Sequence, residues 1–243
     1  MIVLQKALNE ENYVNRVISD FHDEDWVDRI IVIDGGSTDY TVHELRQWPK
    51  CEVYIHPWKD DYHDMEVCQS NIALSYVPLG EICFILDFDE RCSPELKKIL
   101  AEINRKKELP EGADIAHVSR RTYELIRFEN SPYAIIGDDG WPLISHQIGQ
   151  YPDFQCRIIK RRVEHRWINS PHHTLIGFEK NVNIQADLIH YEKDDYRDRI
   201  RIEKKWARVQ ARRKELGLVC DLYETRVKPE FYKYTQPEYW NQE

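Results

Sequence analysis

Short blocks of apolar residues alternate with amphipathic segments along the first half of the chain. The block at 29–34 is nearly all β-branched and ends at two glycines, which is typical of a buried parallel strand. Residues 10–21 carry apolar side chains at spacings of three and four, which predicts one buried helical face. We expect strands at residues 2–8, 29–34, 51–56 and 81–86. We expect helices at residues 10–21, 41–48 and 65–76.

The alternation of strands and helices predicts an α/β fold with an open, mostly parallel sheet flanked by helices. A further helix is expected to open with Ser93 as N-cap and Pro94 in the first helical position. Binding sites in such sheets lie where the parallel strands end. The two polar clusters of the first half, which follow Ile33 and Leu86, fall at that edge.

The second half of the chain is less regular. We expect strands at 113–125 and 154–160, and a long basic helix at 195–216. Clusters of Pro, Gly and Asp between 130 and 153 predict a long functional loop. The chain therefore divides into a main domain at 1–192 and a helical, aromatic C-terminal extension.

The C-terminal extension, residues 193–243, begins with a basic segment. Nine Lys and Arg residues but only two acids lie between 197 and 214. One interpretation is an interfacial helix that contacts an anionic membrane or a phosphorylated acceptor. We favour the alternative, a solvated charged face packed on the main domain. The aromatic tail that follows either packs back on this domain or forms a homo-oligomer contact.

Composition narrows the class of protein. The net charge of −9 argues against nucleic acid as the main partner. The six cysteines are scattered without a Cys-x-x-Cys pair, which favours free thiols over a zinc ribbon. The apolar runs are too short for a transmembrane helix, and the first residues lack the layout of a signal peptide. We therefore expect a cytoplasmic protein, with peripheral contact to the inner face of a membrane as the variant.

Two carboxylates, Asp87 and Asp89, follow the apolar strand expected at 81–86. At i and i+2 they point to opposite faces of a strand, but they can converge on one ion where the strand gives way to a turn. A hard cation such as Mg²⁺ or Mn²⁺ takes oxygen ligands and leaves positions open for phosphate oxygens. The alternative is a strand end with solvated acids.

A second polar cluster, residues 34–39, follows the strand expected at 29–34. Its glycines, Gly35 and Gly36, permit positive φ and let a ligand approach the backbone closely. A nucleoside could lie here, with Asp34 accepting a hydrogen bond from a base N–H. The alternative is an ordinary connection between a strand and a helix. No Gly-x-Gly-x-x-Gly fingerprint is present.

Four motifs, taken together in their order and spacing, resemble glycosyltransferase family 2. They lie at residues 9–11, 31–41, 69–74 and 84–90. The resemblance spans about residues 2–192. The branch it looks most like is the small glucosyltransferases of bacterial lipopolysaccharide core assembly, which carry motifs similar to 152–158 and 172–175. This chain departs from the family at Phe88, where a small residue is usual.

The resemblance implies a GT-A fold that binds a nucleotide-sugar, with uracil as the base. Asp34 would bind the nucleobase, and Asn9 and Glu10 would line the nucleotide pocket. Gln69 and Asn71 would face the donor. The pair of aspartates, Asp87 and Asp89, would hold Mn²⁺ or Mg²⁺ and contact the ribose and diphosphate.

The general base is open between two residues. In the related branch a Glu commonly follows the His, whereas here His173 stands in that place. His173 and Asp153 are the rival bases, and we favour Asp153 slightly because a carboxylate stays ionised beside an anionic donor. Asp138 and Asp139 are further candidates. His172 would be a metal or phosphate ligand.

The resulting function is metal-dependent transfer of a sugar, with inversion, to a hydroxyl of a glycan or glycolipid acceptor. The base takes the proton of the acceptor hydroxyl as the oxygen of this hydroxyl attacks the anomeric carbon. One alternative is a non-catalytic nucleotide- or glycan-binding module, supported by His173 in place of Glu. The other is a haloacid-dehalogenase-type phosphatase, in which Asp-x-Asp also ends a strand, although Arg91 stands where that class carries Thr or Val.

Overall fold

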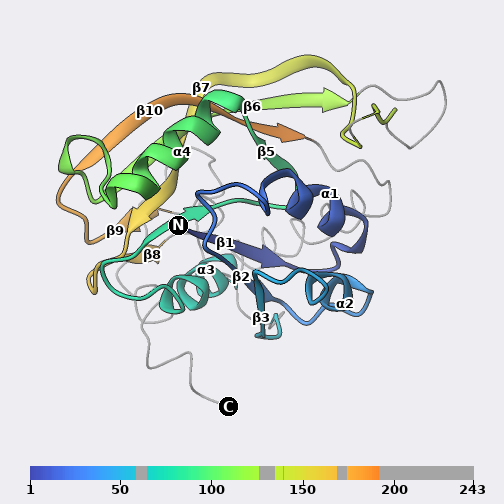
Figure 1. The fold of residues 1–243 in the computed structure, drawn as a ribbon, viewed down its shortest axis with the longest axis horizontal. Coiled ribbons are helices and arrows are strands. Elements are labelled where there is room, and N and C mark those ends of the chain that lie inside the picture. Colours follow the sequence, from blue (N-terminus) through green and yellow to red (C-terminus); the bar gives the residue numbers. More distant parts are fainter. Residues whose placement is uncertain (59–64, 126–134, 139, 169–173, 192–243) are drawn as a thin grey trace, which may run out of the picture.

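The computed structural model describes residues 1–58, 65–125, 135–138, 140–168 and 174–191 (Figure 1). The basic helix and aromatic tail expected at 193–243 lie outside the described residues. In the part that is described, no helix is long and apolar enough to cross a membrane. The cysteines of this part are free thiols, as expected: Cys51, Cys68, Cys83, Cys92 and Cys156.

The observed elements follow the expected order through the first half. The strands are β1 Ile2–Ala7, β2 Arg29–Asp34, β3 Cys51–Ile55, β4 Ile82–Ile85, β5 Glu90–Cys92, β6 Ile115–Leu125, β7 Ile144–Lys160, β8 Arg166–Ile168, β9 Thr174–Ile176 and β10 Asn181–Tyr191. The helices are α1 Glu11–Phe21, α2 Thr41–Leu45, α3 Met65–Ser75 and α4 Pro94–Lys106, with a 3₁₀ turn at Pro110–Gly112.

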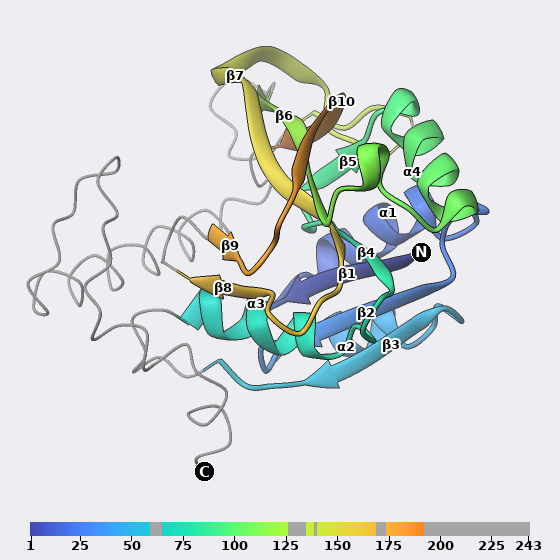
Figure 2. The same ribbon diagram turned by 90° about the vertical axis from the view of Figure 1, so that its left-hand side faces the viewer.

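Eight strands form one sheet in the order β3-β2-β1-β4-β7-β6-β10-β5. Strands β3, β2, β1 and β4 are parallel, as are β6 and β10, whereas β7 runs antiparallel to both of its neighbours. Figure 2 shows the sheet curling, so that β7, β6 and β10 rise away from β1–β3. The α/β fold with helices on both faces is confirmed.

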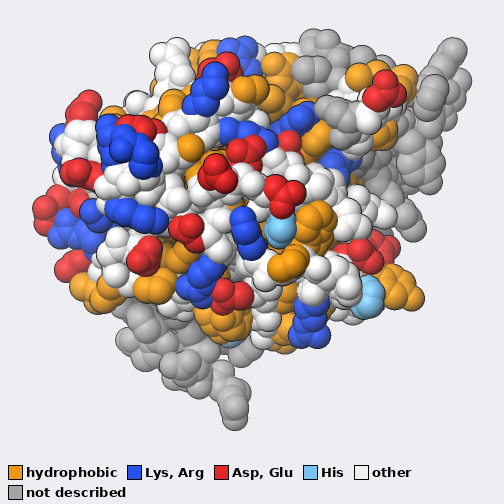
Figure 3. Space-filling model, viewed as in Figure 1, with side chains coloured by type: hydrophobic (Ala, Val, Ile, Leu, Met, Phe, Trp, Pro, Cys, Tyr) orange, Lys and Arg blue, Asp and Glu red, His pale blue; other side chains and the backbone are white. Residues whose placement is uncertain are grey.

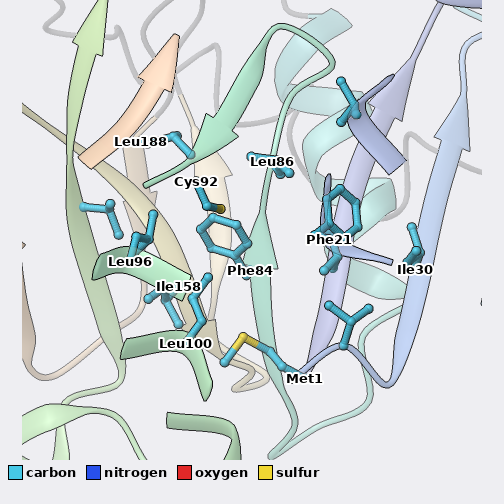
Figure 4. Close-up of a cluster of buried hydrophobic side chains, with 14 of the residues drawn as sticks. Met1, Phe21, Ile30, Phe84, Leu86, Cys92, Leu96, Leu100, Ile158 and Leu188 are labelled. Atoms are coloured by element: carbon cyan, nitrogen blue, oxygen red, sulfur yellow. The ribbon is translucent and has the colours of Figure 1, made fainter. Parts of the chain in front are cut away.

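The core consists of two apolar layers, one on each face of the sheet. Val3 and Phe84 belong to the layer under α1 and α4, whereas their neighbours Leu4 and Cys83 belong to the layer under α3. This split follows from the alternation of side chains along a strand. Phe84 lies between Phe21 of α1 and the leucines of α4 (Figure 4).

Helix α4 begins as the sequence predicts. The Ser93 hydroxyl accepts a hydrogen bond from the Leu96 amide at 3.2 Å, and Pro94 occupies the first turn. Along the helix, Glu102 pairs with Arg105 and Lys106. Acidic and basic side chains are interspersed over the face drawn in Figure 3, so this face carries no large field of one sign.

The prediction of a long loop at 130–153 is wrong over the second part of this range. Residues 144–153 belong to β7, which pairs with β6 from Ile144 to Ile159. The Gly and Pro residues that suggested a loop lie at an irregularity of this strand, where Gly149 has φ +75° and the Tyr151–Pro152 bond is cis. Glycine and proline are tolerated inside strands at such bulges. Strands β8, β9 and β10 were not expected either.

Candidate functional site

The polar clusters lie together because β1, β2 and β4 are neighbours that end at one edge of the sheet. The register pairs Ala7 with Asp34 and Leu4 with Ile85. The chain therefore leaves β1, β2 and β4 into three adjacent loops, at 8–10, 35–40 and 86–89. The loops hold Asn9, Glu10, Gly36, Asp87 and Asp89, and Asp34 is the last residue of β2 before its loop.

The first two loops are hydrogen-bonded to one another. Asn9 adopts a left-handed conformation with φ 56°. Its side-chain oxygen accepts the Thr38 amide at 2.8 Å, and its own amide donates to the Ser37 hydroxyl at 2.8 Å. The Glu10 amide donates to the Thr41 hydroxyl at 2.6 Å. The polar groups of these loops thus fix the shape of the backbone of both loops.

Asp34 is turned into its own loop. The residue is 0% exposed, and its Oδ1 accepts the amides of Gly36 and Ser37, both at 2.9 Å. Its Oδ2 accepts the Ser37 hydroxyl. Gly36 has φ +89°, which favours glycine, and a Cβ there would lie 3.5 Å from Pro57. Asp34 therefore contributes to the shape of this loop by orienting the backbone amides of Gly36 and Ser37.

Gln69 and Asn71 of α3 lie beneath the surface. Gln69 donates to the carbonyl of His56 at 2.8 Å, just after β3. Asn71 donates to the carbonyl of Trp167 at 2.9 Å and accepts the Trp167 amide at 2.7 Å. Both side chains are buried. Asn71 therefore attaches β8 to α3, and Gln69 attaches the end of β3.

The Asp-Phe-Asp turn places its aromatic residue inward and its acids outward. Phe88 is buried in the core, whereas the side chains of Asp87 and Asp89 are 40% and 22% exposed. The Asp87 amide donates to Glu90 Oε2 at 3.0 Å. Asp87 Oδ2 accepts a hydrogen bond from Arg157 at 3.1 Å. The large side chain at 88 thus anchors the turn without blocking its acidic face.

The charges around the turn shift the pKa of its acids in opposite directions. Burial alone raises the pKa of Asp87, but the charges of Arg157 and Lys6 outweigh it and hold the pKa below its ordinary value. Burial raises the pKa of Glu90 to about 7, against the opposing charge of Arg157. Asp87 is therefore an anion at neutral pH.

A histidine of β10 completes this side of the site. His190 Nε2 lies 3.7 Å from Asp89 Oδ2, and its Nδ1 lies 3.2 Å from the Thr122 hydroxyl of β6. The Tyr191 amide donates to the Asp89 carbonyl at 2.8 Å, which ties the turn to β10. Burial lowers the pKa of His190, but the adjacent carboxylates of Asp89 and Glu90 raise it overall.

Asp153 lies on β7, directly opposite Arg120 of β6. Its Oδ2 accepts two hydrogen bonds from Arg120, at 2.7 and 3.0 Å, and its Oδ1 accepts one from Gln155 at 2.7 Å. The charge of Arg120 also acts on His190. A row of charged groups therefore runs from Asp89 through His190 and Arg120 to Asp153.

Three of the expected residues cannot be placed by the structure. His172 and His173 lie outside the described residues, between β8 and β9, and Asp139 is also outside them. Asp138 is exposed in the turn before β7. Within the described ranges, no three His, Cys, Asp or Glu side chains converge closely enough to form a metal site by themselves.

Sequence reasoning missed Arg157, His190, Arg120 and Lys6. Arg157 lies inside the segment 152–158 that carried the resemblance, so its position held a signal, but no pattern in the sequence shows that it turns toward Asp87. His190 follows an alternating apolar stretch at 182–188, which indicates a strand in retrospect. Arg157, His190 and Arg120 are brought to the acids by the pairing of β7, β10 and β6, whereas Lys6 lies on β1, which pairs with β4.

Several solved structures are similar to part of this chain. TarS 1–349 of S. aureus is 21% identical over 50% of this chain and 35% of its own, with a TM-score of 0.39. Glucosyl-3-phosphoglycerate synthase from Mycobacterium tuberculosis, solved with Mn²⁺, UDP-glucose and phosphoglyceric acid, is 24% identical over 49% and 43%, with a TM-score of 0.37. The chain thus spans about a third to two fifths of the length of these proteins.

A third solved structure, 4-diphosphocytidyl-2C-methyl-D-erythritol synthase, is 12% identical over 65% of this chain and 72% of its own, with a TM-score of 0.40. The family comparison is broader than any of these. The model of the family described as glycosyl transferase family 2 matches residues 3–179. This range covers most of the chain and contains both polar loops, the Asp-Phe-Asp turn and β7. The chain belongs to glycosyl transferase family 2.

Proposed function

We propose that this chain is a metal-dependent glycosyltransferase that takes a sugar from a UDP-linked donor and transfers it, with inversion, to a hydroxyl acceptor. The observation that carries the proposal is the meeting of the Asp-Phe-Asp turn with His190 at the carboxyl edge of the sheet. Membership of glycosyl transferase family 2 supports the class of reaction. The same membership leaves the phosphatase alternative without support.

The residues at the turn fit a divalent cation. Asp89 and His190 offer a carboxylate oxygen and an imidazole nitrogen side by side, and the exposed carboxylate of Asp87 lies on the same turn. Mn²⁺ accepts both kinds of ligand. Such ions are commonly held by one or two carboxylates together with substrate phosphates and water. When bound, the cation neutralises the charge that grows on the departing nucleoside diphosphate.

The donor pocket is proposed over the interlocked loops after β1 and β2. Asn9, Glu10 and Gly36 lie on these loops, and Asp34 orients the amides of Gly36 and Ser37. Uracil is proposed as the base. Gln69 and Asn71 support this pocket from beneath through the end of β3 and through β8.

We propose Asp153 as the group that accepts the proton of the attacking hydroxyl. Arg120 holds its carboxylate at the exposed surface of β6 and β7, in the row of charges that leads back to Asp89. An acceptor bound over β6 and β7 would have its hydroxyl near this carboxylate. His173 is the rival for this role. The acceptor is proposed to be a glycan or glycolipid.

Calorimetry of UDP binding, with and without Mn²⁺, tests the donor and the metal together. We expect measurable UDP affinity that depends on Mn²⁺, and Mn²⁺-dependent release of UDP from UDP-sugars. The matched control is Asp23→Asn, because Asp23 is 96% exposed and lies outside the site. The same UDP affinity in EDTA as in Mn²⁺ would contradict the metal, and no affinity in either condition would contradict the donor.

The base is tested by comparing Asp153→Asn with His173→Ala. Loss of the true base is expected to lower turnover by roughly 10²–10⁴-fold with donor affinity unchanged. A carboxylate base keeps turnover flat down to about pH 5, whereas a histidine base loses turnover below about pH 6.5. Near-normal turnover in Asp153→Asn together with loss in His173→Ala would move the role to His173.

A further inference from the structure

The guanidinium of Arg157 closes a ring of contacts around the Asp-Phe-Asp turn. Its side chain is only 8% exposed. Its Nη1 donates to Asp87 Oδ2 at 3.1 Å, and its Nη2 donates to Glu90 Oε1. The other oxygen of Glu90 accepts the backbone amide of Asp87 at 3.0 Å. Both the side chain and the backbone of Asp87 are therefore held by the same buried pair.

Stability alone is a weak reason for this pair. The side chain of Glu90 is fully buried, and Arg157 Nε has no hydrogen-bond partner in the part of the chain that the structure describes. Removing ions from water costs several kcal/mol each, and an apolar pair of similar volume is often at least as stable. Control of the position of Asp87 is the function that the contacts themselves indicate.

The two aspartates of the turn have different neighbours. Asp87 lies against a guanidinium, which competes with a cation for its Oδ2. Asp89 lies beside the imidazole of His190, which can share a cation with it. We propose that Arg157 is a positioning residue, which holds one oxygen of Asp87, directs the other toward the donor and leaves Asp89 to meet the cation. This inference rests on the proposed function of the same site.

The first test is Arg157→Lys, which keeps the positive charge but cannot bridge two carboxylates with a planar fork. We expect kcat to fall by about 10²-fold, the cost typical of a small misplacement in an active site. The KM for the UDP-sugar should change less than kcat, because the charge stays. Wild-type kcat in Arg157→Lys would overturn the proposal.

The second test measures binding of Mn²⁺ alone by electron paramagnetic resonance, without nucleotide. The variant is Arg157→Gln combined with Glu90→Gln, which removes one positive and one negative group and leaves no buried charge unpaired. Asp87 is then free to turn toward the ion. We expect Mn²⁺ to bind about tenfold more tightly than in the wild type, a gain of one added ligand, equal to about 1.4 kcal/mol. Unchanged Mn²⁺ affinity would overturn the proposal.

A purely structural role for Arg157 has its own signature. It lowers the melting temperature of both variants while kcat of the folded protein and Mn²⁺ affinity stay at wild-type values, and this result also overturns the proposal. If the wild-type chain neither binds UDP with Mn²⁺ nor releases UDP from a donor, the proposed function fails and takes this inference with it. If the wild type does both, the kcat and the Mn²⁺ affinity of the variants decide whether Arg157 is a positioning residue.

Discussion

The two halves of the carboxyl edge use polar residues in opposite ways. In the loops after β1 and β2, polar side chains are bonded to the neighbouring loop or within their own loop, as Asn9 is to Thr38 and Asp34 is to Ser37. At the turn after β4, the acids instead face nitrogen groups from distant strands, the guanidinium of Arg157 and the imidazole of His190. The first region shapes a backbone surface, and the second concentrates charge.

This difference separates two kinds of residue that look alike in the sequence. A buried carboxylate that accepts backbone amides is satisfied by the fold and supports a ligand indirectly. A partly exposed carboxylate among titrating groups retains capacity for a cation or a proton. Substitutions should therefore cost stability in the loops and in their supports, and turnover at the turn. The predictions below test this division.

Among the predictions that test this division, the largest effect is expected on turnover in Asp89→Asn. This change removes the carboxylate beside His190, and kcat should fall by on the order of 10²–10³-fold, as when one stabilising group is removed from a charged transition state. The melting temperature should change little, because partly exposed ion pairs contribute less than about 1 kcal/mol. Steady-state kinetics with Mn²⁺, beside thermal unfolding, measures both. Normal turnover in Asp89→Asn would contradict the role in turnover assigned to the acids of the turn after β4.

Asn71→Ala should act on stability instead. It removes the two hydrogen bonds that Asn71 makes with the backbone of Trp167 beneath the surface, which costs about 2–3 kcal/mol of unfolding free energy. Urea unfolding measures this loss. The control is Ser75→Ala, an exposed change at the end of the same helix. If Asn71→Ala keeps its stability and loses UDP affinity, Asn71 contacts the donor as the family resemblance implied.

Substitution of Asp34 sharpens the comparison at the loops. Asp34→Asn keeps an oxygen for the amides of Gly36 and Ser37 and an amide that can donate to the Ser37 hydroxyl, so UDP affinity should fall less than about threefold. Asp34→Ala loses the acceptor and should lower stability by about 1–2 kcal/mol. Calorimetry and urea unfolding distinguish them. A loss of affinity beyond tenfold in Asp34→Asn shows that the carboxylate itself binds the base.

The smallest effect is the dependence of stability on pH. Burial lowers the pKa of His117 and of His165, so the unfolded chain binds more protons than the folded chain as pH falls below the ordinary value near 6.5. These two histidines therefore lower the unfolding free energy as pH drops from about 7.5 to 5.5, whereas Glu90 and His190, whose pKa values are raised in the folded chain, act in the opposite direction. Replacing both His117 and His165 with Gln should make the unfolding free energy at pH 5.5, relative to that at pH 7.5, higher than in the wild type. The same dependence on pH in the double variant and in the wild type would contradict this role of the two histidines.

The local features of the fold could be predicted from the sequence. Strand β2 spans the expected residues 29–34, and α4 opens at Ser93, because β-branched runs and helix caps act over a few positions. The strand at 144–153 was hidden because Gly149 and Pro152 punctuate it at a bulge. Short-range patterns of this kind do not report which strands will pair.

The partners in the site could be predicted only in part. The Asp-Phe-Asp turn was recognisable from its place after an apolar strand. That Arg157 reaches Asp87 depends on the antiparallel pairing of β7 with β4, across 70 positions of chain. A polar residue such as Asn71 also signals only that it needs hydrogen-bond partners. Whether a ligand or the backbone of a distant strand supplies them is decided by the tertiary fold.

The contact between Asn71 and β8 also guards against misassembly. Among the described strands, the three-residue strand Arg166–Ile168 pairs with β9 alone. An open edge is a template on which another chain can add a strand. Asn71 places one donor and one acceptor against Trp167, just as a neighbouring strand would. At Trp167, a single amide side chain therefore occupies backbone groups to which the strand of another molecule would have to bond.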